Sequence, residues 1–598
     1  MKKYIYIVTA ALCALATASC SDFLEKSNPN KIESEFFFTS EQSLEIYTNG
    51  LIQDYLPANT TFMNGDRYSD AQGWDGSYLF YTDNYDADDA GGWGAGNWSG
   101  LRSINYYLAN MRKADAPEKV LNHYEGVGRF FRAMFYFDKV RTFGDVPWYD
   151  HMIEPDNKED LYKARDSREL VCQKMLEDLN YACENCSADA KYMTRASYVN
   201  KYVALAMKAR FCLYEGTYRK YHNANPSTGQ GWSADESRMY LQECVKACKE
   251  IMDSKAYSLA TNYRNMFTSR DACGDGDCLK EFIWARDYSL DLVVNNDSYS
   301  VNDLMINAQH AQHAFNRDFV MTYLMTDGTP FTTKNPDYYS VKFIDEFKGR
   351  DARMAQTMRT PGFTREDGNT KWGAPDLVYA KSGYQPVKWL TDYIMDQIND
   401  KTATDVPVIR YAEVLLNYAE AKAELGELTE AVWNESVKLV RERAGVKSIY
   451  PTAADPYMVN YFLGRVTDPL ILEVRRERGC EFTMENLRQH DIRRWAMGEL
   501  LIKQKTGLWI DAIETPLDLN GDGKPETFVS KTVKEKAGYA VLDLNAAAGH
   551  RLSEGDYGYI LPNTAMVAGY TWSGKKYLNP IPNSAIIVNE NLKQNYGW

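Results

Sequence analysis

The stretch from Tyr124 to Trp148 constrains the fold of this chain more than any other. Its apolar and aromatic residues recur at helical spacing and widen into a stripe that covers most of the circumference: Phe130, Phe131, Met134, Phe135, Tyr136 and Phe137. A helix this apolar must be surrounded by other helices, because a half-exposed helix keeps a polar face. Gly144 suits the left-handed position after a helix end, and Pro147 follows where a helix cannot continue. The sequence therefore predicts a buried central helix that ends before Gly144.

Composition excludes one large class of partner. The 598 residues carry a formal net charge of −14, whereas nucleic acid demands a basic surface. Aromatic residues make up 13% of the chain, including 43 Tyr and 13 Trp. Tyr and Trp join an apolar body to a polar edge and are typical of binding faces.

The N-terminus has the pattern of a secretory signal. Lys2 and Lys3 precede an apolar run, and small residues lead to Cys20. Cleavage after small residues is the ordinary alternative, but Ala18-Ser19-Cys20 fits a lipobox. We expect residues 1–19 to be a signal peptide, Cys20 to be lipidated and residues 20–32 to be a polar tether. No other segment approaches the roughly 20 apolar residues of a membrane span.

Helical periodicity dominates the rest of the chain. Predicted helices cover 32–56, 101–113, 117–143, 167–185, 198–216, 235–254, 408–425, 429–444, 468–478 and 483–501. The pair at 408–444 is spaced much like a tetratricopeptide unit. The predicted fold class is mainly all-α: tetratricopeptide-like hairpins form a superhelical scaffold, and long irregular aromatic loops carry the ligand-binding portion.

We expect one domain over 33–598. It has an N-terminal helical part at 33–270 with an aromatic loop at 62–100, an irregular insertion at 271–401, and a C-terminal helical part with an irregular tail at 402–598. A loop as long as 62–100 is usually functional or disordered, and its aromatic content argues against disorder.

Catalytic motifs give no positive signal. The sequence has no nucleophile elbow, phosphate-binding loop or HExxH motif. His310 and His313 have chelating spacing, but no third ligand is evident. A glycosidase needs only two carboxylates at a set separation, and a sequence with 82 acidic residues neither shows nor excludes such a pair.

One loop has the pattern of a calcium site. Oxygen side chains stand at loop positions 1, 3, 5 and 9, and glycine stands at position 6. The predicted ligands of a structural calcium are Asp518, Asn520, Asp522, Lys524 and Glu526. Val529 replaces the glutamate expected at position 12, and a tight turn without an ion is the alternative. No other cofactor is expected.

The cysteines and the alternating charged residues are expected to stabilise the fold rather than to form a catalytic or binding site. Nine cysteines remain after Cys13 and Cys20 are set aside, and we expect buried thiols with Cys273–Cys278 as the best candidate disulfide. Alternating charges at helical spacing predict ion pairs between helices rather than an anion site: Glu473, Arg475, Arg476, Glu477, Arg478, Glu481, Arg488, Asp491, Arg493 and Arg494. The same is expected of Arg129, Arg132 and Arg141.

Several blocks resemble the SusD/RagB family. They are the lipobox followed by CSDFLE, GRFFRAMFYFDKVRTFGDVP, IRYAEVLLNYAEAKAELG, VRRERGCEFTMENLRQHDIRRW and the ending KKYLNPIPNSAIIVNENLKQNYGW. The resemblance implies a lipid-anchored protein exposed on the outer membrane of Bacteroidetes-type bacteria. It implies four tetratricopeptide-like pairs and a non-catalytic role: the protein binds a glycan, sometimes a peptide, and caps a SusC-like TonB-dependent transporter that imports it. A surface glycoside hydrolase, a peptide-binding member and a structural adhesin are the alternatives.

Sugar chemistry independently selects the candidate ligand residues. Sugar rings pack their C–H faces on Trp and Tyr, while Asp, Asn and Arg bind the hydroxyls. The first aromatic loop supplies Arg67, Asp70, Trp74, Asp75, Tyr78, Tyr81, Trp93, Asn97 and Trp98. A second wall is expected from Trp284, Tyr288, Asn296 and Tyr299.

Overall fold

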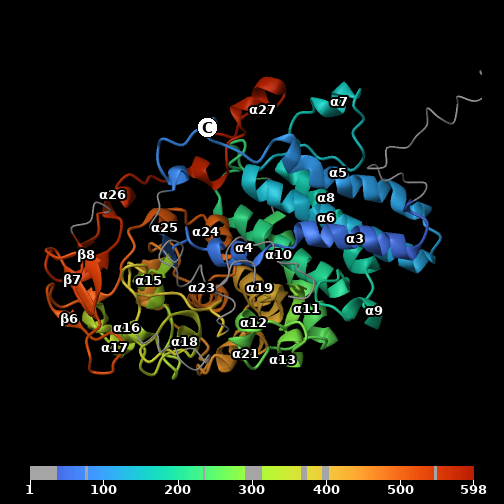
Figure 1. The fold of residues 1–598 in the computed structure, drawn as a ribbon. Helices are drawn as coiled ribbons and strands as arrows, with labels where there is room; N and C mark the ends of the chain where they lie inside the picture. The colour runs from blue at the N-terminus through green and yellow to red at the C-terminus, as the bar shows by residue number, and fades with distance from the viewer. Residues whose placement is uncertain are drawn as a thin grey trace, which may run out of the picture.

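A computed structural model describes residues 37–74, 78–232, 236–289, 313–364, 374–392, 403–544 and 549–598. The chain is mainly helical, as predicted, and short strands gather in its C-terminal part (Figure 1). Residues 1–36, with Cys20 and the predicted tether, lie outside the described residues. No described helix is long and apolar enough to cross a membrane.

The predicted central helix is α6, Glu118–Phe143, and its boundaries are confirmed. Pro117 is the N-cap, and Gly144 ends the helix with a φ of 76°. Two glycines let neighbours approach closely: a Cβ on Gly126 would lie 2.8 Å from Cys186 Sγ, and one on Gly128 would lie 2.7 Å from Leu108 Cδ2. The helix is therefore buried on nearly all sides, including at its glycines.

The long helices stack in chain order around α6. Their bounds are α3 Glu41–Tyr55, α5 Ala95–Asn110, α8 Arg168–Asn185, α10 Lys201–Tyr221, α11 Glu236–Ser254, α19 Tyr411–Glu424 and α23 Pro469–Phe482. Helix α5 packs on α6, α6 on α8, α8 on α10, α10 on α11, α11 on α19 and α19 on α23. Such an array of adjacent helices buries a continuous core.

Several predicted helices have different bounds in the structure: α5 begins at Ala95, inside the predicted loop 62–100, and α23 continues to Phe482. Helix α10 continues through Gly216 to Tyr221, because Leu241 of α11 packs against that glycine at a distance that a side chain would block. The helix predicted at 408–425 begins as a strand, β4 Val406–Arg410. The helices predicted at 429–444 and 483–501 are each split in two. They become α20 Glu430–Asn434 with α21 Val437–Arg443, and α24 Arg488–Arg494 with α25 Glu499–Ile502.

Short elements fill the segments predicted to be irregular. The remaining helices are α4 Asn59–Gly65, η1 Leu79–Tyr81, η2 Met111–Lys113, α7 Lys158–Leu161, α9 Ala190–Met193, α12 Asn265–Thr268, α13 Gly276–Leu279, α15 Arg317–Val320, α16 Phe331–Lys334, η3 Tyr338–Ser340, α17 Phe343–Glu346, α18 Arg353–Thr357, α22 Pro456–Tyr461, α26 Thr564–Val567, η5 Gly574–Tyr577 and α27 Asn583–Val588. Most span a single turn, too short for a helical period to be recognised.

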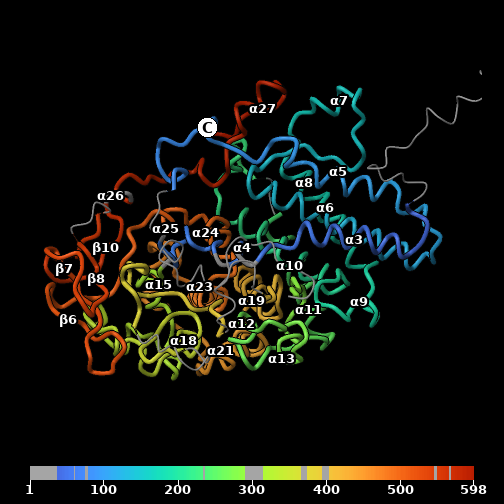
Figure 2. Tube along the Cα trace, in the orientation of Figure 1, coloured from blue at the N-terminus to red at the C-terminus, as the bar shows by residue number. Residues whose placement is uncertain are grey.

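Four small sheets tie distant segments together. Strand β1 Gln72–Trp74 pairs with β3 His313–Phe315, and β2 Phe282–Arg286 pairs with β4, both antiparallel. The C-terminal tail forms two three-stranded sheets: β5 Trp509–Ile510, β10 Gly558–Leu561 and β9 Arg551–Leu552, then β6 Pro516–Leu517, β7 Thr527–Ser530 and β8 Ala540–Asp543. Figure 2 follows the chain from the stacked helices at one end to these strands at the other.

Most of the predicted ion pairs between helices form, whereas Arg141 pairs with Asp138 of its own helix. Arg132 binds Asp178 through two bonds of 2.7 Å between α6 and α8. Arg494 binds Glu420, and Glu481 on α23 accepts hydrogen bonds from Arg353, Arg410 and Arg443. Buried charges of this kind are tolerated only when they are paired and hydrogen-bonded. The arginine cluster is therefore part of the scaffold and does not offer an open anion site.

Candidate functional site

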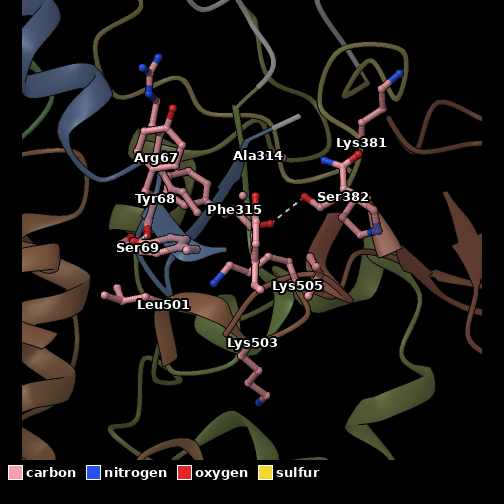
Figure 3. A pocket seen from close by; sticks show the side chains of 17 residues that line it. Arg67, Tyr68, Ser69, Ala314, Phe315, Lys381, Ser382, Leu501, Lys503 and Lys505 are labelled. Atoms are coloured by element: carbon pink, nitrogen blue, oxygen red, sulfur yellow. Dashed lines mark hydrogen bonds between the residues drawn. The ribbon is translucent and has the colours of Figure 1, made fainter. Parts of the chain in front are cut away.

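The structure brings five segments far apart in the sequence around one pocket. We call it the Lys505 pocket, and Figure 3 shows its side chains. The segments are 67–73 with Tyr81, 314–315, 381–382, 501–505 and 562–570, and the pocket volume is about 60 Å³. Pairing of β1 with β3 places Gln72 opposite Phe315 on its wall. The backbone N–H of Asn316 donates to Ala71 O at 2.8 Å and extends this contact.

A buried ion pair holds the loop that bears Arg67 and Tyr68. Asp70 is 3% exposed and accepts hydrogen bonds from Arg488 at 2.8 and 2.7 Å and from the Tyr461 hydroxyl at 2.6 Å. Burial raises the pKa of Asp70, but the charge and hydrogen bonds of Arg488 outweigh it and leave that pKa lowered. Asp70 was predicted to bind ligand. The structure instead places it beneath the pocket as an anchor, with both oxygens occupied.

Aromatic rings stand on one side of this pocket. Tyr68 stacks on Tyr78 with ring centroids 4.1 Å apart, and the Arg67 guanidinium lies 4.9 Å from the Tyr68 centroid. The Tyr570 hydroxyl accepts the backbone N–H of Tyr78 at 3.1 Å. Tyr81 is 2% exposed, and its hydroxyl donates to Tyr68 O at 2.9 Å. Of the predicted ligand residues, the structure therefore brings Arg67, Tyr78 and Tyr81 together around Tyr68.

Positive charge collects at the same pocket. Lys505 ends among the lining side chains, whereas Arg67, Lys381 and Lys503 extend outward from it in different directions (Figure 3). Lys503 pairs with Asp318 at 2.7 Å. Burial lowers the pKa of Lys505 to about 8, although the charges of Asp70 and Asp318 oppose this shift. The Lys505 ammonium is therefore mostly protonated at pH 7.

Trp93 and Trp98 lie elsewhere, in a second hollow that we call the Trp93 cleft. Its volume is about 940 Å³, and it lies between the segments 90–105, 147–163 and 582–592. The two indoles meet edge to face at 5.4 Å. Trp93 also contacts Phe143 at 5.0 Å, and Trp98 contacts Phe135 at 5.5 Å. Both indoles are half-buried against α6, which gives them a bracing role whatever else they bind.

The second predicted wall does not form in the described part of the chain. Trp284 is fully buried on β2 and donates its indole N–H to Ser197 O at 3.0 Å, and Tyr288 is 5% exposed. These two residues were predicted to bind ligand and are core residues instead, because β2 pairs with β4 inside the molecule. Asn97 is exposed and lines a separate hollow beside Asp54. Asp75, Asn296, Tyr299 and His310 lie outside the described residues, as do the side chains of Trp74 and His313.

Sequence reasoning missed Tyr68, Gln72, Lys505 and Tyr570 at the pocket. Tyr68 had a signal, because it neighbours the predicted Arg67 in the first aromatic loop. Gln72 is 1% exposed and lines the pocket from strand β1. Lys505 and Tyr570 belong to the C-terminal tail, and nothing local connects them to a loop more than 400 residues earlier.

The predicted calcium loop forms a tight turn. Asp518 accepts the backbone N–H groups of Gly521 at 2.7 Å and Gly523 at 2.8 Å. Asn520 and Asp522 accept backbone N–H groups two residues ahead, each at a distance of 2.7–2.8 Å. These bonds satisfy the loop by itself. Calcium binding there stays a prediction.

The nine cysteines among the described residues are free thiols, so the predicted disulfide between Cys273 and Cys278 is wrong. The Cys278 thiol lies 3.7 Å from Asp275, and Cys273 turns toward Asp287 and Asp405 with all three ligand atoms within 4.8 Å of one another. Asp405 accepts the backbone N–H groups of Cys273 and Tyr288, both at 2.8 Å. Backbone bonding therefore explains this carboxylate without an ion.

Family models match most of the chain. Residues 280–598 match the model described as the SusD family, and residues 22–213 match one described as starch-binding associating with outer membrane. Among curated proteins, the chain is 24% identical over 524 residues to SusD-like protein P2 of Formosa agariphila, covering 83% of this chain and 92% of that protein. It is 22% identical over 524 residues to a SusD-like protein of Bacteroides ovatus, covering 83% of each.

Solved structures share the fold. A SusD-like carbohydrate binding protein from Bacteroides fragilis superposes with a TM-score of 0.67 at 20% identity, over 93% of this chain and 100% of that one. A second SusD-like protein from Bacteroides fragilis gives a TM-score of 0.65 at 21% identity, over 96% of this chain and 100% of that one. At these identities the likeness speaks for the fold alone.

Proposed function

The chain belongs to the SusD family, and from this premise we propose that it is a non-catalytic glycan-binding protein whose ligand site includes the Lys505 pocket. The single observation that carries the proposal is the convergence of aromatic faces, hydrogen-bond donors and cations from five chain segments on one pocket. Sites of this composition hold ligands whose apolar faces stack and whose hydroxyls accept hydrogen bonds.

The geometry around Tyr68 suits an oligosaccharide. Tyr68 and Tyr570 are half-buried and line the pocket, so each keeps part of its side chain within reach of a sugar. Their positions do not depend on the ligand, because Asp70 and Arg488 anchor the loop and the Tyr570 hydroxyl binds Tyr78. A site that is already ordered loses little conformational entropy on binding.

The protein is further proposed to pass its glycan to a SusC-like TonB-dependent transporter while held at the cell surface by lipid on Cys20. The SusD family assignment and the lipobox at Ala18-Ser19-Cys20 support this step. Lipid anchoring keeps a binding protein beside its partner and replaces diffusion in the medium by a high local concentration.

A glycan array on the purified, detergent-solubilised protein tests the binding function. We expect selective binding to one polysaccharide class. Failure to bind any polysaccharide or oligosaccharide on a broad array would contradict the proposal. Selective binding to peptides would show instead that the ligand is a peptide.

Two further measurements separate binding from other roles. Incubation with the bound polysaccharide should leave its chain length unchanged, whereas release of shorter products would reveal a glycosidase. Affinity purification from solubilised outer membranes should recover a large TonB-dependent barrel. Its reproducible absence would favour a structural adhesin over an uptake protein.

A further inference from the structure

We propose that the Lys505 pocket binds an acidic substituent of the glycan, a carboxylate or a sulfate ester, so that the ligand is an anionic polysaccharide. This inference rests on the proposed function and names the ligand class of the same site. It follows from the charge of the pocket, from the bonding of Lys505 and Gln72, and from the size of the cavity.

The lining is cationic in a protein that is strongly acidic overall. Among the described residues that line the pocket, Arg67, Lys381, Lys503 and Lys505 are cationic and none is acidic. The whole chain has 82 Asp and Glu against 68 Lys and Arg, for a net charge of −14. The local positive charge raises the concentration of anionic ligands at the pocket. The net negative charge of the rest of the chain disfavours adsorption of polyanions elsewhere.

Lys505 is bonded much more weakly than a fully buried lysine of the same protein. A lysine ammonium has three N–H donors. The Lys388 ammonium donates hydrogen bonds to Glu485 at 2.6 Å, to the Tyr263 hydroxyl at 2.7 Å and to Thr483 O at 2.9 Å. In the described parts of the chain, Lys505 has one hydrogen bond, to Leu500 O at 3.4 Å, and no ion pair.

The two acidic groups whose charges act on Lys505, Asp70 and Asp318, are already engaged. Asp70 is held by Arg488 at 2.8 and 2.7 Å, and Asp318 accepts from Lys503 at 2.7 Å. The ammonium therefore keeps donors that a ligand or water can satisfy. An anionic group is the partner that gains most from a desolvated ammonium, because charge-assisted hydrogen bonds are about twice as strong as neutral ones.

Gln72 gives a second, independent indication of a ligand. It is 1% exposed and lines the pocket, yet neither its amide nitrogen nor its amide oxygen has a hydrogen-bond partner in the described structure. An unpaired buried amide is destabilising, so such groups persist where a ligand or water satisfies them. The amide N–H of Gln72 and the ammonium of Lys505 together provide donors for the oxygens of one small anion.

The cavity has the size of a substituent. Its volume of about 60 Å³ holds a few water molecules, since one water needs roughly 10–15 Å³ on this measure. A carboxylate or a sulfate ester fits this space. The sugar ring would remain outside against Tyr68 and Tyr570, while its acidic group enters toward Lys505.

Matched pairs of polysaccharides test the inference. The probes are homogalacturonan with its fully methyl-esterified form, and dextran sulfate with dextran, titrated calorimetrically against the protein in 0.15 M NaCl. We expect at least tenfold tighter binding of one acidic member than of its neutral partner, and the preference should shrink as salt rises because the contact is ionic.

Two variants and one control assign that preference to the pocket. Lys505→Gln and Gln72→Leu should each reduce the acidic-to-neutral ratio at least fivefold. Gln72→Leu removes an unpaired amide, so the protein should stay folded by circular dichroism. Lys174→Gln, on the outer face of α8 and paired with Glu177, is the matched charge control and should leave the ratio unchanged.

The outcomes separate this inference from the proposed function. Equal binding of acidic and neutral members, or an unchanged ratio in both folded variants, overturns the acidic-substituent inference while glycan binding stands. Binding of no polysaccharide on the wider glycan array overturns the proposed function itself.

Discussion

Arg488 binds Asp70 through two short hydrogen bonds, 2.8 Å from Nε to Oδ1 and 2.7 Å from Nη2 to Oδ2. The pair joins the first aromatic loop to helix α24, which lies 418 positions later in the chain. Both residues are at most 5% exposed. The loop that bears Arg67 and Tyr68 is therefore fixed to the scaffold at Asp70 and lines the Lys505 pocket three residues away.

Breaking this pair should affect both stability and binding. Asp70→Asn leaves the buried Arg488 charge uncompensated, and loss of one partner of a buried pair costs about 3–5 kcal/mol. Urea unfolding should show that loss, and glycan affinity should fall because Tyr68 is no longer fixed. Asp156→Asn, at an exposed carboxylate, is the control. Unchanged stability of Asp70→Asn would mean that the pair does not anchor the loop.

The two aromatic clusters should respond differently to alanine. Tyr68→Ala should weaken glycan binding roughly tenfold, equivalent to about 1.4 kcal/mol, because it removes a stacking face. Trp98→Ala should lower the free energy of unfolding by up to about 3 kcal/mol through lost packing on Phe135, with affinity changed less than twofold. Calorimetric titration and urea unfolding of both variants check this. The reverse pattern would place the glycan in the Trp93 cleft.

Acid should weaken the helix stack through Glu215. Burial raises the pKa of this carboxyl, but the charges of Arg168 and Arg219 outweigh burial and lower it to about 2, below the ordinary 4.5. The stabilisation is therefore present above about pH 4.5 and is lost as pH falls toward 2. By linkage it amounts to about 3 kcal/mol.

Urea midpoints between pH 6 and pH 3 measure this effect. The protein should lose stability over that range, and Glu215→Gln should start less stable and show a shallower slope. Glu184→Gln, on the exposed face of α8, should keep the slope of the parent. Parallel slopes for Glu215→Gln and the parent would show that another group controls acid stability.

The central helix should not accept charge. Phe135 is 7% exposed in α6 and packs edge to face on Tyr136 at 5.3 Å. Phe135→Asp buries an unpaired carboxylate and removes a packed ring. The summed free-energy cost is comparable to the whole free energy of unfolding of a typical domain. The Phe135→Asp protein should aggregate on expression or lack the helical circular dichroism of the parent. Gln173→Asp, on the exposed face of α8, should fold normally. A folded Phe135→Asp protein would refute the buried position.

Helices could be predicted where the sequence carries its own signals. Ser167 and Asp468 cap α8 and α23, Gly144 ends α6, and the structure agrees at each of these points. Gly216 misled the prediction, because the same residue type serves both as a helix end and as a close-packing point between α10 and α11.

The ligand site could be predicted only in part, for a physical reason. Arg67 and Tyr78 were recognised because the aromatic loop is contiguous. Lys505 and Tyr570 reach the pocket through tertiary pairing of short segments, and strands of two to four residues have no recognisable period. Trp284 was placed in the ligand site because the sequence of an irregular segment does not show whether an aromatic side chain faces the ligand or the core.

The measurement that tests the account most directly is a crystal structure of the protein with the polysaccharide fragment selected on the glycan array. We predict a sugar residue packed on Tyr68 and Tyr570, with its acidic group within 3.2 Å of Lys505 Nζ, a charge-assisted hydrogen bond. A fragment bound in the Trp93 cleft, with the Lys505 pocket holding only water, would contradict the account.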